Sequence, residues 1–326
     1  MISDAKAIVF KQAGAVNVRK IGIPDIKEDE ILTKTLFSGV SIGTERWVLA
    51  GKRSDAAFPC IPGYQNVGKI IALGKKVRNF KVGDHVLQCA FSQLPKGMNH
   101  GCGSAHASHL VGNYKNAVPL LAGVNKKQAA LAWVAGCSLE GIILSKVAKK
   151  DKVLVIGQGL IGQMSAQIAR SCGATVYTAD IDDRRLELSK RYSADVVINP
   201  AKTPLGQAIE ELSPGGVDIA IEATGNKKLI DLAISCIKPH GKLCLQGWYP
   251  GRISLDFMKA HMKEISIHFP CAWGWKKGLL KVQKLLQQKK INPLITDCVD
   301  FKKAPGIYRK MLCGKTQALG IVFKWH

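Results

Sequence analysis

A glycine-rich stretch near the middle of the chain has the residue types and the spacing of a phosphate-binding loop. The β-branched run Lys152–Ile156 predicts a buried strand, and a Gly-x-Gly-x-x-Gly motif follows it directly. In this motif the first glycine makes a tight turn, the second lets backbone approach a pyrophosphate, and the third allows close helix–strand packing. The amides at the start of the following helix would bind the phosphates, where the helix dipole favours negative charge. The residues assigned to this dinucleotide site are Gly157, Gly159, Leu160, Ile161 and Gly162.

An acidic residue follows at the distance that such a motif requires. The segment Ala174–Ala179 predicts a second strand, and Asp180 comes at its end, close to the ~20 residues expected after the glycines. A carboxylate there accepts hydrogen bonds from the adenosine ribose hydroxyls and repels a 2′-phosphate, so Asp180 favours NAD over NADP. Arg184 and Arg185 leave NADP open as an alternative, because arginine side chains also bind phosphate.

The size and composition of the chain indicate a globular protein of two domains. It has 326 residues, of which 47% are hydrophobic. The N-terminus lacks the apolar stretch of a signal peptide, and no segment reaches the ~18 apolar residues of a membrane span. Ten cysteines occur without a Cys-x-x-Cys pair, which favours reduced thiols over a disulfide framework. We expect a cytoplasmic protein that does not enter a membrane.

The net charge of +23 is the unusual global property. Between Cys271 and His326 there are twelve Lys or Arg residues and two acidic residues, a balance of +10. The basic residues come mainly as spaced pairs, without the interleaved aromatics of an RNA-binding module. A solvated basic face is the simplest interpretation. An anionic substrate or nonspecific binding of a polyanion is the alternative, because such a field concentrates anions.

The order of predicted elements divides the chain into three segments. Residues 1–121 contain short strands broken by Gly and Pro, which predict a barrel-like β domain. Residues 122–269 begin with helical patterns and then alternate strands and helices, with a sixth strand at Glu264–Phe269. This alternation predicts a doubly wound parallel sheet, so the fold class is α/β. In residues 270–326 a strand-like pair flanks a helix, and we expect this tail to pack back onto the first domain.

This order of domains resembles the medium-chain dehydrogenase/reductase (alcohol dehydrogenase-like) superfamily over essentially the whole chain. Several local marks support the resemblance besides the glycine motif: Ser38–Glu45, Pro62–Ile70, Val82–Val86 and Glu222–Gly225. The resemblance implies a GroES-like catalytic domain, completed by the returning tail, and a Rossmann domain that binds NAD. It also implies a ribose contact from Arg185, nicotinamide-side contacts from Thr224, Gly225 and Gly247, and a homodimer through the edge of the Rossmann sheet.

The zinc ligands of this superfamily are missing here. The position of the ligand cysteine holds Ser41 or Ile42, and the Gly-His-Glu segment reads Gly63-Tyr64-Gln65. Cys137 or Glu140 could supply a third ligand, but one ligand cannot hold a catalytic zinc ion. The cysteine-rich structural-zinc lobe is also absent. A cluster formed by His100, His106 and His109 is conceivable, although their spacing favours a loop or surface role. We therefore expect no metal.

Without zinc, a side chain must manage the proton of the reacting alcohol or carbonyl. Thr44 aligns with the hydroxyl that contacts the substrate oxygen in the zinc enzymes, and Trp47 stands where those enzymes often have a relay histidine. Tyr64, at a former ligand position, could donate a proton to a carbonyl oxygen, and a packing role is equally plausible. The proposed catalytic residues are Thr44 and Tyr64.

The resemblance favours a zinc-independent, NAD(H)-dependent oxidoreductase that interconverts a secondary alcohol and a ketone. Aromatic residues at 248–249 and 273–275 favour a flat or bulky substrate, although core aromatics would look the same. Zinc-lacking branches that the chain resembles include hydroxyethyl-chlorophyllide dehydrogenases and dehydrogenases of polysaccharide or secondary metabolism. Two alternatives remain open: a quinone or enone reductase of the same superfamily, and a dinucleotide-binding protein without turnover that binds polyanions.

Overall fold

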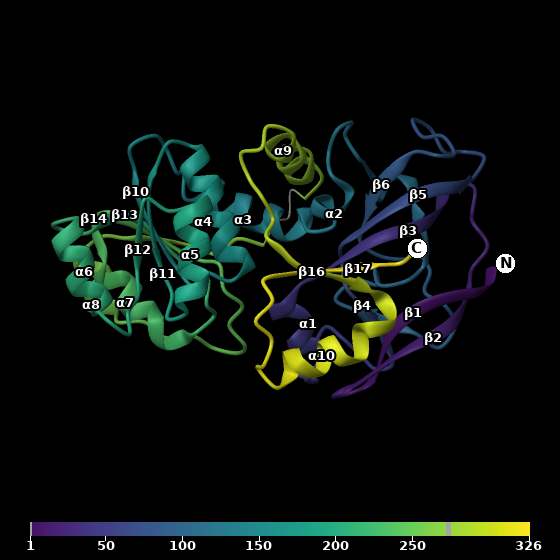
Figure 1. Cartoon of the computed structure of the whole chain (residues 1–326), viewed down its shortest axis with the longest axis horizontal. Coiled ribbons are helices and arrows are strands. Elements are labelled where there is room, and N and C mark those ends of the chain that lie inside the picture. The colour runs from purple at the N-terminus through teal and green to yellow at the C-terminus, as the bar shows by residue number, and fades with distance from the viewer. Residues whose placement is uncertain (1, 272–274) are drawn as a thin grey trace. The chain divides into compact units, whose positions relative to one another are not determined.

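The structure, a computed structural model, describes residues 2–271 and 275–326 and divides into two compact units (Figure 1). Unit 1 consists of Met1–Trp133 and Ile295–His326, and unit 2 of Val134–Leu294. The α/β fold class is confirmed. Of the predicted returning tail, residues 295–326 belong to unit 1 and the residues before them to unit 2.

Both domain boundaries lie further along the chain than the predicted ones after residues 121 and 269. The short helix α2 (Lys126–Ala129) packs on strands of unit 1, although its helical pattern predicts the start of the next domain. The segment after the sixth Rossmann strand stays in unit 2, where Gln167 and Asn292 exchange two hydrogen bonds of 3.2 and 2.6 Å. These are tertiary contacts that no local pattern reveals.

Unit 2 is built on a six-stranded parallel sheet with the order β12-β11-β10-β13-β14-β15. The strands are β10 (Lys152–Ile156), β11 (Thr175–Ala179), β12 (Val196–Ile198), β13 (Val217–Glu222), β14 (Ile237–Leu245) and β15 (Ser266–His268). The order reverses beside β10, which pairs with β11 on one side and β13 on the other. In such a sheet, ligands bind beyond the carboxyl ends of the strands at this reversal point.

Helices surround this sheet (Figure 1). They are α3 (Ala132–Leu144), α4 (Leu160–Ser171), α5 (Asp183–Tyr192), α6 (Leu205–Leu212), α7 (Ile230–Ser235) and α8 (Phe257–Met262). Helix α9 (Trp275–Gln287) also belongs to unit 2. Helices α6 and α7 share one apolar core with β10, β11, β13 and β14. Strand β10 is buried along nearly its whole length, which explains its continuous apolar sequence.

In the part of the chain that the structure describes, unit 1 contains two sheets and the α-helices α1 (Ile42–Leu49), α2 and α10 (Ala304–Leu312). One sheet has the order β2-β1-β4-β7, and the other has the order β16-β17-β3-β5-β6-β9, with β8 paired to β3. The strands of the first are β2 (Ala15–Ile23), β1 (Ile2–Gln12), β4 (Cys60–Pro62) and β7 (Asn99–Gly101). The second contains β16 (Ile295–Asp300), β17 (Gly320–Lys324), β3 (Glu30–Val40), β5 (Asn66–Leu73), β6 (His85–Gln88), β9 (Val118–Pro119) and β8 (His109–Asn113).

The C-terminal strand joins the two parts of the sequence that form unit 1. Strand β17 pairs antiparallel with β3, where Phe323 lies opposite Ser38, and parallel with β16. Tyr308 of α10 and Phe323 are fully buried with Phe10 of β1 in one core. The tail thus completes the interior of unit 1. Within the described residues, no helix has the length and apolar character needed to cross a bilayer.

Candidate functional site

The first and third glycines of the loop in unit 2 pack closely against neighbouring residues, whereas the middle glycine borders open space. Gly157 has a φ of +89°, and a Cβ on it would lie 2.5 Å from the Thr224 side chain. A Cβ on Gly162 would lie 1.8 Å from the carbonyl oxygen of Gly157, so α4 starts in direct contact with the loop. By contrast, apart from its two neighbours in the chain, no atom of the described residues comes within 4 Å of a Cβ on Gly159. A pyrophosphate could therefore approach the backbone at Gly159.

Helix α4 presents its first amides beside this opening. Gly159 is its N-cap residue, and no side chain of the described residues caps the helix. The first amides of a helix have no acceptor within the helix, so those of Leu160 and Ile161 can bind phosphate oxygens. The predicted phosphate-binding residues thus come together in one loop.

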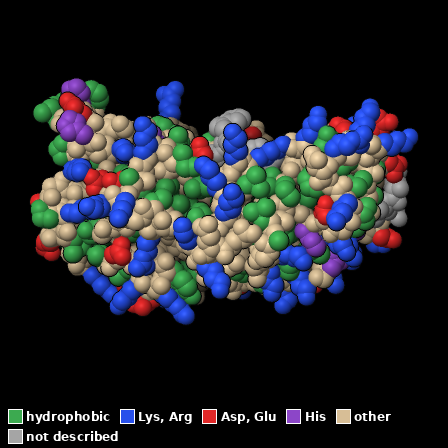
Figure 2. Space-filling view, turned by 90° about the horizontal axis from the view of Figure 1, so that it is seen from above, with side chains coloured by type: hydrophobic (Ala, Val, Ile, Leu, Met, Phe, Trp, Pro, Cys, Tyr) green, Lys and Arg blue, Asp and Glu red, His purple; other side chains and the backbone are tan. Residues whose placement is uncertain are grey.

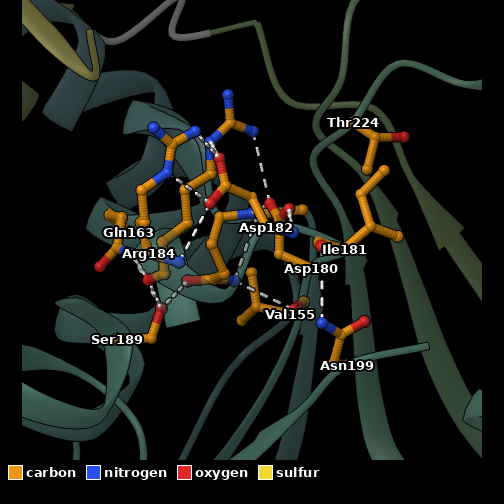
Figure 3. Close-up of polar contacts among 12 residues, drawn as sticks. Val155, Gln163, Asp180, Ile181, Asp182, Arg184, Ser189, Asn199 and Thr224 are labelled. Atoms are coloured by element: carbon orange, nitrogen blue, oxygen red, sulfur yellow. Dashed lines mark hydrogen bonds and ion pairs between the residues drawn. The ribbon is translucent and has the colours of Figure 1, made fainter. Parts of the chain in front are cut away.

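Asp180 lies where the ribose carboxylate is predicted, at the end of β11 and beside the glycine loop (Figure 3). Its Oδ2 accepts a 2.7 Å hydrogen bond from the Gln158 amide, and its Oδ1 accepts a 2.9 Å bond from the Asp182 amide. The residue is 8% exposed. These two backbone amides hold the Asp180 side chain in place. Because a carboxylate has about four acceptor positions, Asp180 can still accept a hydrogen bond from a ligand hydroxyl.

The two arginines beside Asp180 are occupied by acidic partners. The Arg185 guanidinium lies 3.4 Å from Asp180 Oδ2, and Arg184 donates to Asp182 at 3.1 and 2.8 Å (Figure 3). The hydrogen bond from Arg184 holds the pKa of Asp182 below its usual range. Both guanidinium groups therefore already have a carboxylate partner, which weakens the case for a site that binds the 2′-phosphate of NADP.

A buried carboxylate organises the loops beyond β13 and β14. Glu222 is fully buried and accepts hydrogen bonds from the Thr224 amide at 2.8 Å, the Gly225 amide at 3.1 Å, the Thr224 hydroxyl and the Tyr249 phenol. Burial, and then the Glu222 carboxylate, raise the pKa of Tyr249. A Cβ on Gly247 would lie 2.3 Å from the Gly225 amide, so these two glycines let the loops touch. The predicted residues Thr224, Gly225 and Gly247 are therefore adjacent.

Unit 1 holds the two predicted catalytic residues. Thr44 lies in α1, and Tyr64 lies in the turn between β4 and β5, directly after Gly63, whose φ is +87°. Both side chains are half-buried. The charged groups of Arg46 and Lys52 lie 5.4 and 5.3 Å from the centroid of the Trp47 ring. Trp47 therefore makes cation–π contacts, which is a packing role.

A chain of buried hydrogen bonds lies behind these residues in unit 1. Glu45 and His106 are fully buried, and their Oε2 and Nε2 atoms are 3.0 Å apart. His106 Nδ1 lies 2.7 Å from the Ser38 hydroxyl, which accepts a 2.8 Å bond from Trp325 Nε1. The Tyr308 phenol donates to Glu45, and burial followed by that carboxylate raises its pKa.

Of the loop or surface role predicted for the histidine group, His106 has the loop position, between β7 and β8, but not the surface position. His100 is exposed on β7, but His106 is fully buried. His109 is half-buried beside His326, and burial lowers its pKa to about 4. The three side chains have different environments and form no metal cluster within the described residues.

Comparison with known proteins identifies the family. Residues 27–133 match the alcohol dehydrogenase GroES-like domain, and residues 161–277 match the zinc-binding dehydrogenase family. L-threonine 3-dehydrogenase from Pyrococcus abyssi is 24% identical over 96% of this chain and 97% of its own length. Sorbitol dehydrogenase from Halalkalibacterium halodurans is 26% identical, with coverages of 88% and 90%. The chain belongs to the alcohol dehydrogenase-like superfamily of oxidoreductases.

A solved alcohol dehydrogenase shows the same fold. Benzyl alcohol dehydrogenase from Acinetobacter calcoaceticus superposes with a TM-score of 0.88 at 22% identity and covers 100% of both chains. The predicted GroES-like and Rossmann domains are confirmed by this likeness and by the family matches.

One family description implies a zinc ion, but the side chains of this oxidoreductase do not provide a set of ligands for one. A catalytic zinc site needs three protein ligands from Cys, His, Asp or Glu. In residues 2–271 and 275–326, no three such side chains gather in a way that could hold a metal ion. Ile42 and Tyr64 offer neither an imidazole nor a thiolate.

Sequence reasoning missed several residues of these sites. Glu222 could have been found, because a carboxylate ending the apolar strand Val217–Glu222 must have buried partners. Glu45 appears only as part of a motif, and no local signal joins it to Tyr308, 263 residues away. Of the predicted aromatics, Tyr249 bonds to Glu222 and Trp248 is 48% exposed. Trp273 and the side chain of Trp275 lie outside the described residues.

Proposed function

We propose that this oxidoreductase uses NAD(H) to interconvert a secondary alcohol and a ketone without catalytic zinc. The arrangement of Asp180 beside a glycine loop that is open at Gly159 carries the proposal. The names of its curated relatives, dehydrogenases of L-threonine, D-arabinitol and sorbitol, support an alcohol as the substrate class. Bound NAD(H) would accept or supply the hydride.

The choice of cofactor rests on this chain's own residues, because one solved neighbour is bound to NADP and another is complexed with NADH. We expect a lower dissociation constant for NADH than for NADPH, since the Asp180 carboxylate would repel a 2′-phosphate. Asp180→Asn removes this charge and should reduce the preference at least about tenfold. Fluorescence titration with both cofactors measures it. Asp183→Asn, an exposed neighbour, is the control, and tighter binding of NADPH to the wild type would contradict the proposal.

Proton transfer in the absence of zinc falls to side chains of unit 1. We propose that Tyr64 donates to the carbonyl oxygen and that Thr44 contacts the same oxygen. Tyr64→Phe keeps the ring but removes the hydroxyl, so turnover should fall at least about tenfold. Steady-state kinetics with the best substrate measures this effect. Tyr114→Phe, in the same unit, is the control and should keep wild-type turnover. Wild-type turnover in Tyr64→Phe would instead show that Tyr64 has only a packing role.

The decisive experiment is a parallel screen of alcohols, ketones, quinones and enones with NADH and NADPH. The protein is first treated with a chelator, and its zinc content is measured. Turnover of alcohols at zinc levels far below one per chain supports the proposal. Turnover that needs added zinc overturns the zinc-independent part, and turnover of quinones or enones alone indicates the reductase alternative.

Polyanion binding without turnover is the competing proposal from another class. Lys and Arg side chains are spread over the whole face shown in Figure 2, without one dominant cluster. This distribution favours a solvated basic surface. Salt-dependent binding to nonspecific DNA, together with no turnover in the screen, would favour the alternative.

We also propose a homodimer through the edge of the Rossmann sheet. Strand β15 ends the sheet, and nearby α8 has three large apolar side chains that are at least 60% exposed: Phe257, Met258 and Met262. Exposed apolar groups beside an open sheet edge are typical of an interface. Light scattering should give twice the chain mass of 35.3 kDa, and a monomer at micromolar concentration would contradict the proposal.

A further inference from the structure

The buried histidine of unit 1 contacts both segments that carry the proposed catalytic residues. The hydrogen-bond directions along its network follow from the donors available. Trp325 Nε1 can only donate, so the Ser38 oxygen accepts from it, and the same hydroxyl forms a 2.7 Å hydrogen bond with His106 Nδ1. A carboxylate can only accept, so His106 Nε2 donates to Glu45. This fixes one orientation of the imidazole between two elements.

On one side, His106 holds the turn that leads to Tyr64. A Cβ on Gly63 would lie 2.5 Å from the His106 ring, so the imidazole fills the space that a side chain would occupy. The backbone continues this contact: the Ala105 amide donates to the Gly63 carbonyl at 2.9 Å, and the His106 amide donates to the Pro62 carbonyl at 3.1 Å. The residue just before Tyr64 is therefore packed directly on His106.

On the other side, His106 acts through Glu45 on the start of α1. Glu45 Oε1 accepts a 2.8 Å hydrogen bond from the Ser41 amide, while Oε2 faces His106 and the Tyr308 phenol. Ser41 is the N-cap position of α1, and Thr44 is the residue next to Glu45 in that helix. The same carboxylate therefore fixes the N-terminal turn of the helix that carries Thr44.

We infer that His106 is a positioning residue, which through Glu45 holds the Thr44 helix and the Tyr64 turn in register with each other. It touches neither substrate nor cofactor in this role. The inference rests on the proposed function only where turnover is the readout. It explains why a histidine and a glutamate are buried together, at a cost in hydration, in a domain whose apolar core could otherwise exclude them.

Two variants separate the contacts of His106. His106→Gln keeps a donor near the position of Nε2 and so preserves the bond to Glu45. His106→Asn keeps an acceptor near Nδ1 for Ser38 but cannot reach Glu45. We expect His106→Asn to lower kcat about 10- to 100-fold, and His106→Gln to stay within about threefold of the wild type. The dissociation constant for NADH should stay within about twofold in both, because the nucleotide loop belongs to unit 2. His100→Asn, at an exposed histidine, is the control.

A second readout does not depend on turnover. Amide hydrogen exchange should be at least about tenfold faster at Ser41 and in the peptide containing Gly63 in His106→Asn, and near the wild-type rate in His106→Gln. If His106→Asn does not fold, Glu45→Asp provides the test. Its shorter side chain cannot span Ser41 and His106 together, so the same losses are expected.

The outcomes are distinguishable. If wild-type protein has no turnover but the exchange pattern is as expected, the proposed function fails and the positioning role stands. Unchanged exchange at Ser41 in His106→Asn, or a kcat within threefold of the wild type, overturns the positioning role. An equal loss of kcat in the Gln and Asn variants also overturns it, since the bond to Glu45 would then make no difference.

Discussion

Replacing Glu222 by Leu should lower the free energy of unfolding by at least about 3 kcal/mol. The substitution leaves four donors without their acceptor: the Tyr249 phenol, the Gly225 amide, and the amide and hydroxyl of Thr224. Leaving a buried donor unsatisfied costs about 1–3 kcal/mol each, and part of this cost is relieved where water enters. Thermal and urea unfolding of the cofactor-free protein measure the effect.

Two further variants test the cause of this loss. Tyr249→Phe removes one donor and leaves the carboxylate with three, so we expect a cost of about 1 kcal/mol. Glu264→Leu replaces a glutamate in the same unit whose side chain is 72% exposed, and its cost should stay within about 0.5 kcal/mol. If Glu222→Leu unfolds at the same urea concentration as Glu264→Leu, the carboxylate does not organise these loops.

The sequence predicts the nucleotide half of the molecule well because its signals are local. The strand before Gly157, the glycine spacing and Asp180 lie within one strand–helix–strand unit, whose parts must be neighbours in space. The reversal of strand order beside β10 then brings Glu222 to the same edge. Glu222 could therefore have been placed from the predicted sheet alone.

The interior of unit 1 could not be predicted in the same way. The bond between Trp325 and Ser38 spans 287 residues and depends on the pairing of β17 with β3, for which the sequence offers no pattern. The burial of His106 could not be predicted for this reason. Its neighbours in the sequence favour a surface position, whereas its partners come from α1 and β3. The family resemblance marks the segment Ser38–Glu45, which contains both partners, but does not connect it with His106.

Gly159→Ala should abolish cofactor binding without destabilising the fold. The backbone at Gly159 has a φ of −67° and a ψ of −176°, which alanine adopts without strain, and beyond the two adjacent residues no described atom lies within 4 Å of the new Cβ. The methyl group would occupy the space into which a pyrophosphate must come. We expect the dissociation constant for NADH to rise at least about 100-fold, or ~2.7 kcal/mol, while the free energy of unfolding changes by less than about 0.5 kcal/mol. Calorimetric titration and thermal unfolding measure the two quantities.

Two other glycines separate a binding effect from a packing effect. A Cβ on Gly206, in α6, also meets no described atom within 4 Å beyond its chain neighbours and its own helix backbone, so Gly206→Ala should keep wild-type affinity for NADH. Gly162→Ala should lose both stability and affinity, because its Cβ would lie 1.8 Å from the Gly157 carbonyl oxygen. If Gly159→Ala binds NADH as tightly as Gly206→Ala does, the loop is only a tight turn. If, of the three variants, only Gly159→Ala keeps wild-type stability and loses affinity for NADH, then the pyrophosphate of the cofactor binds in the open space at Gly159.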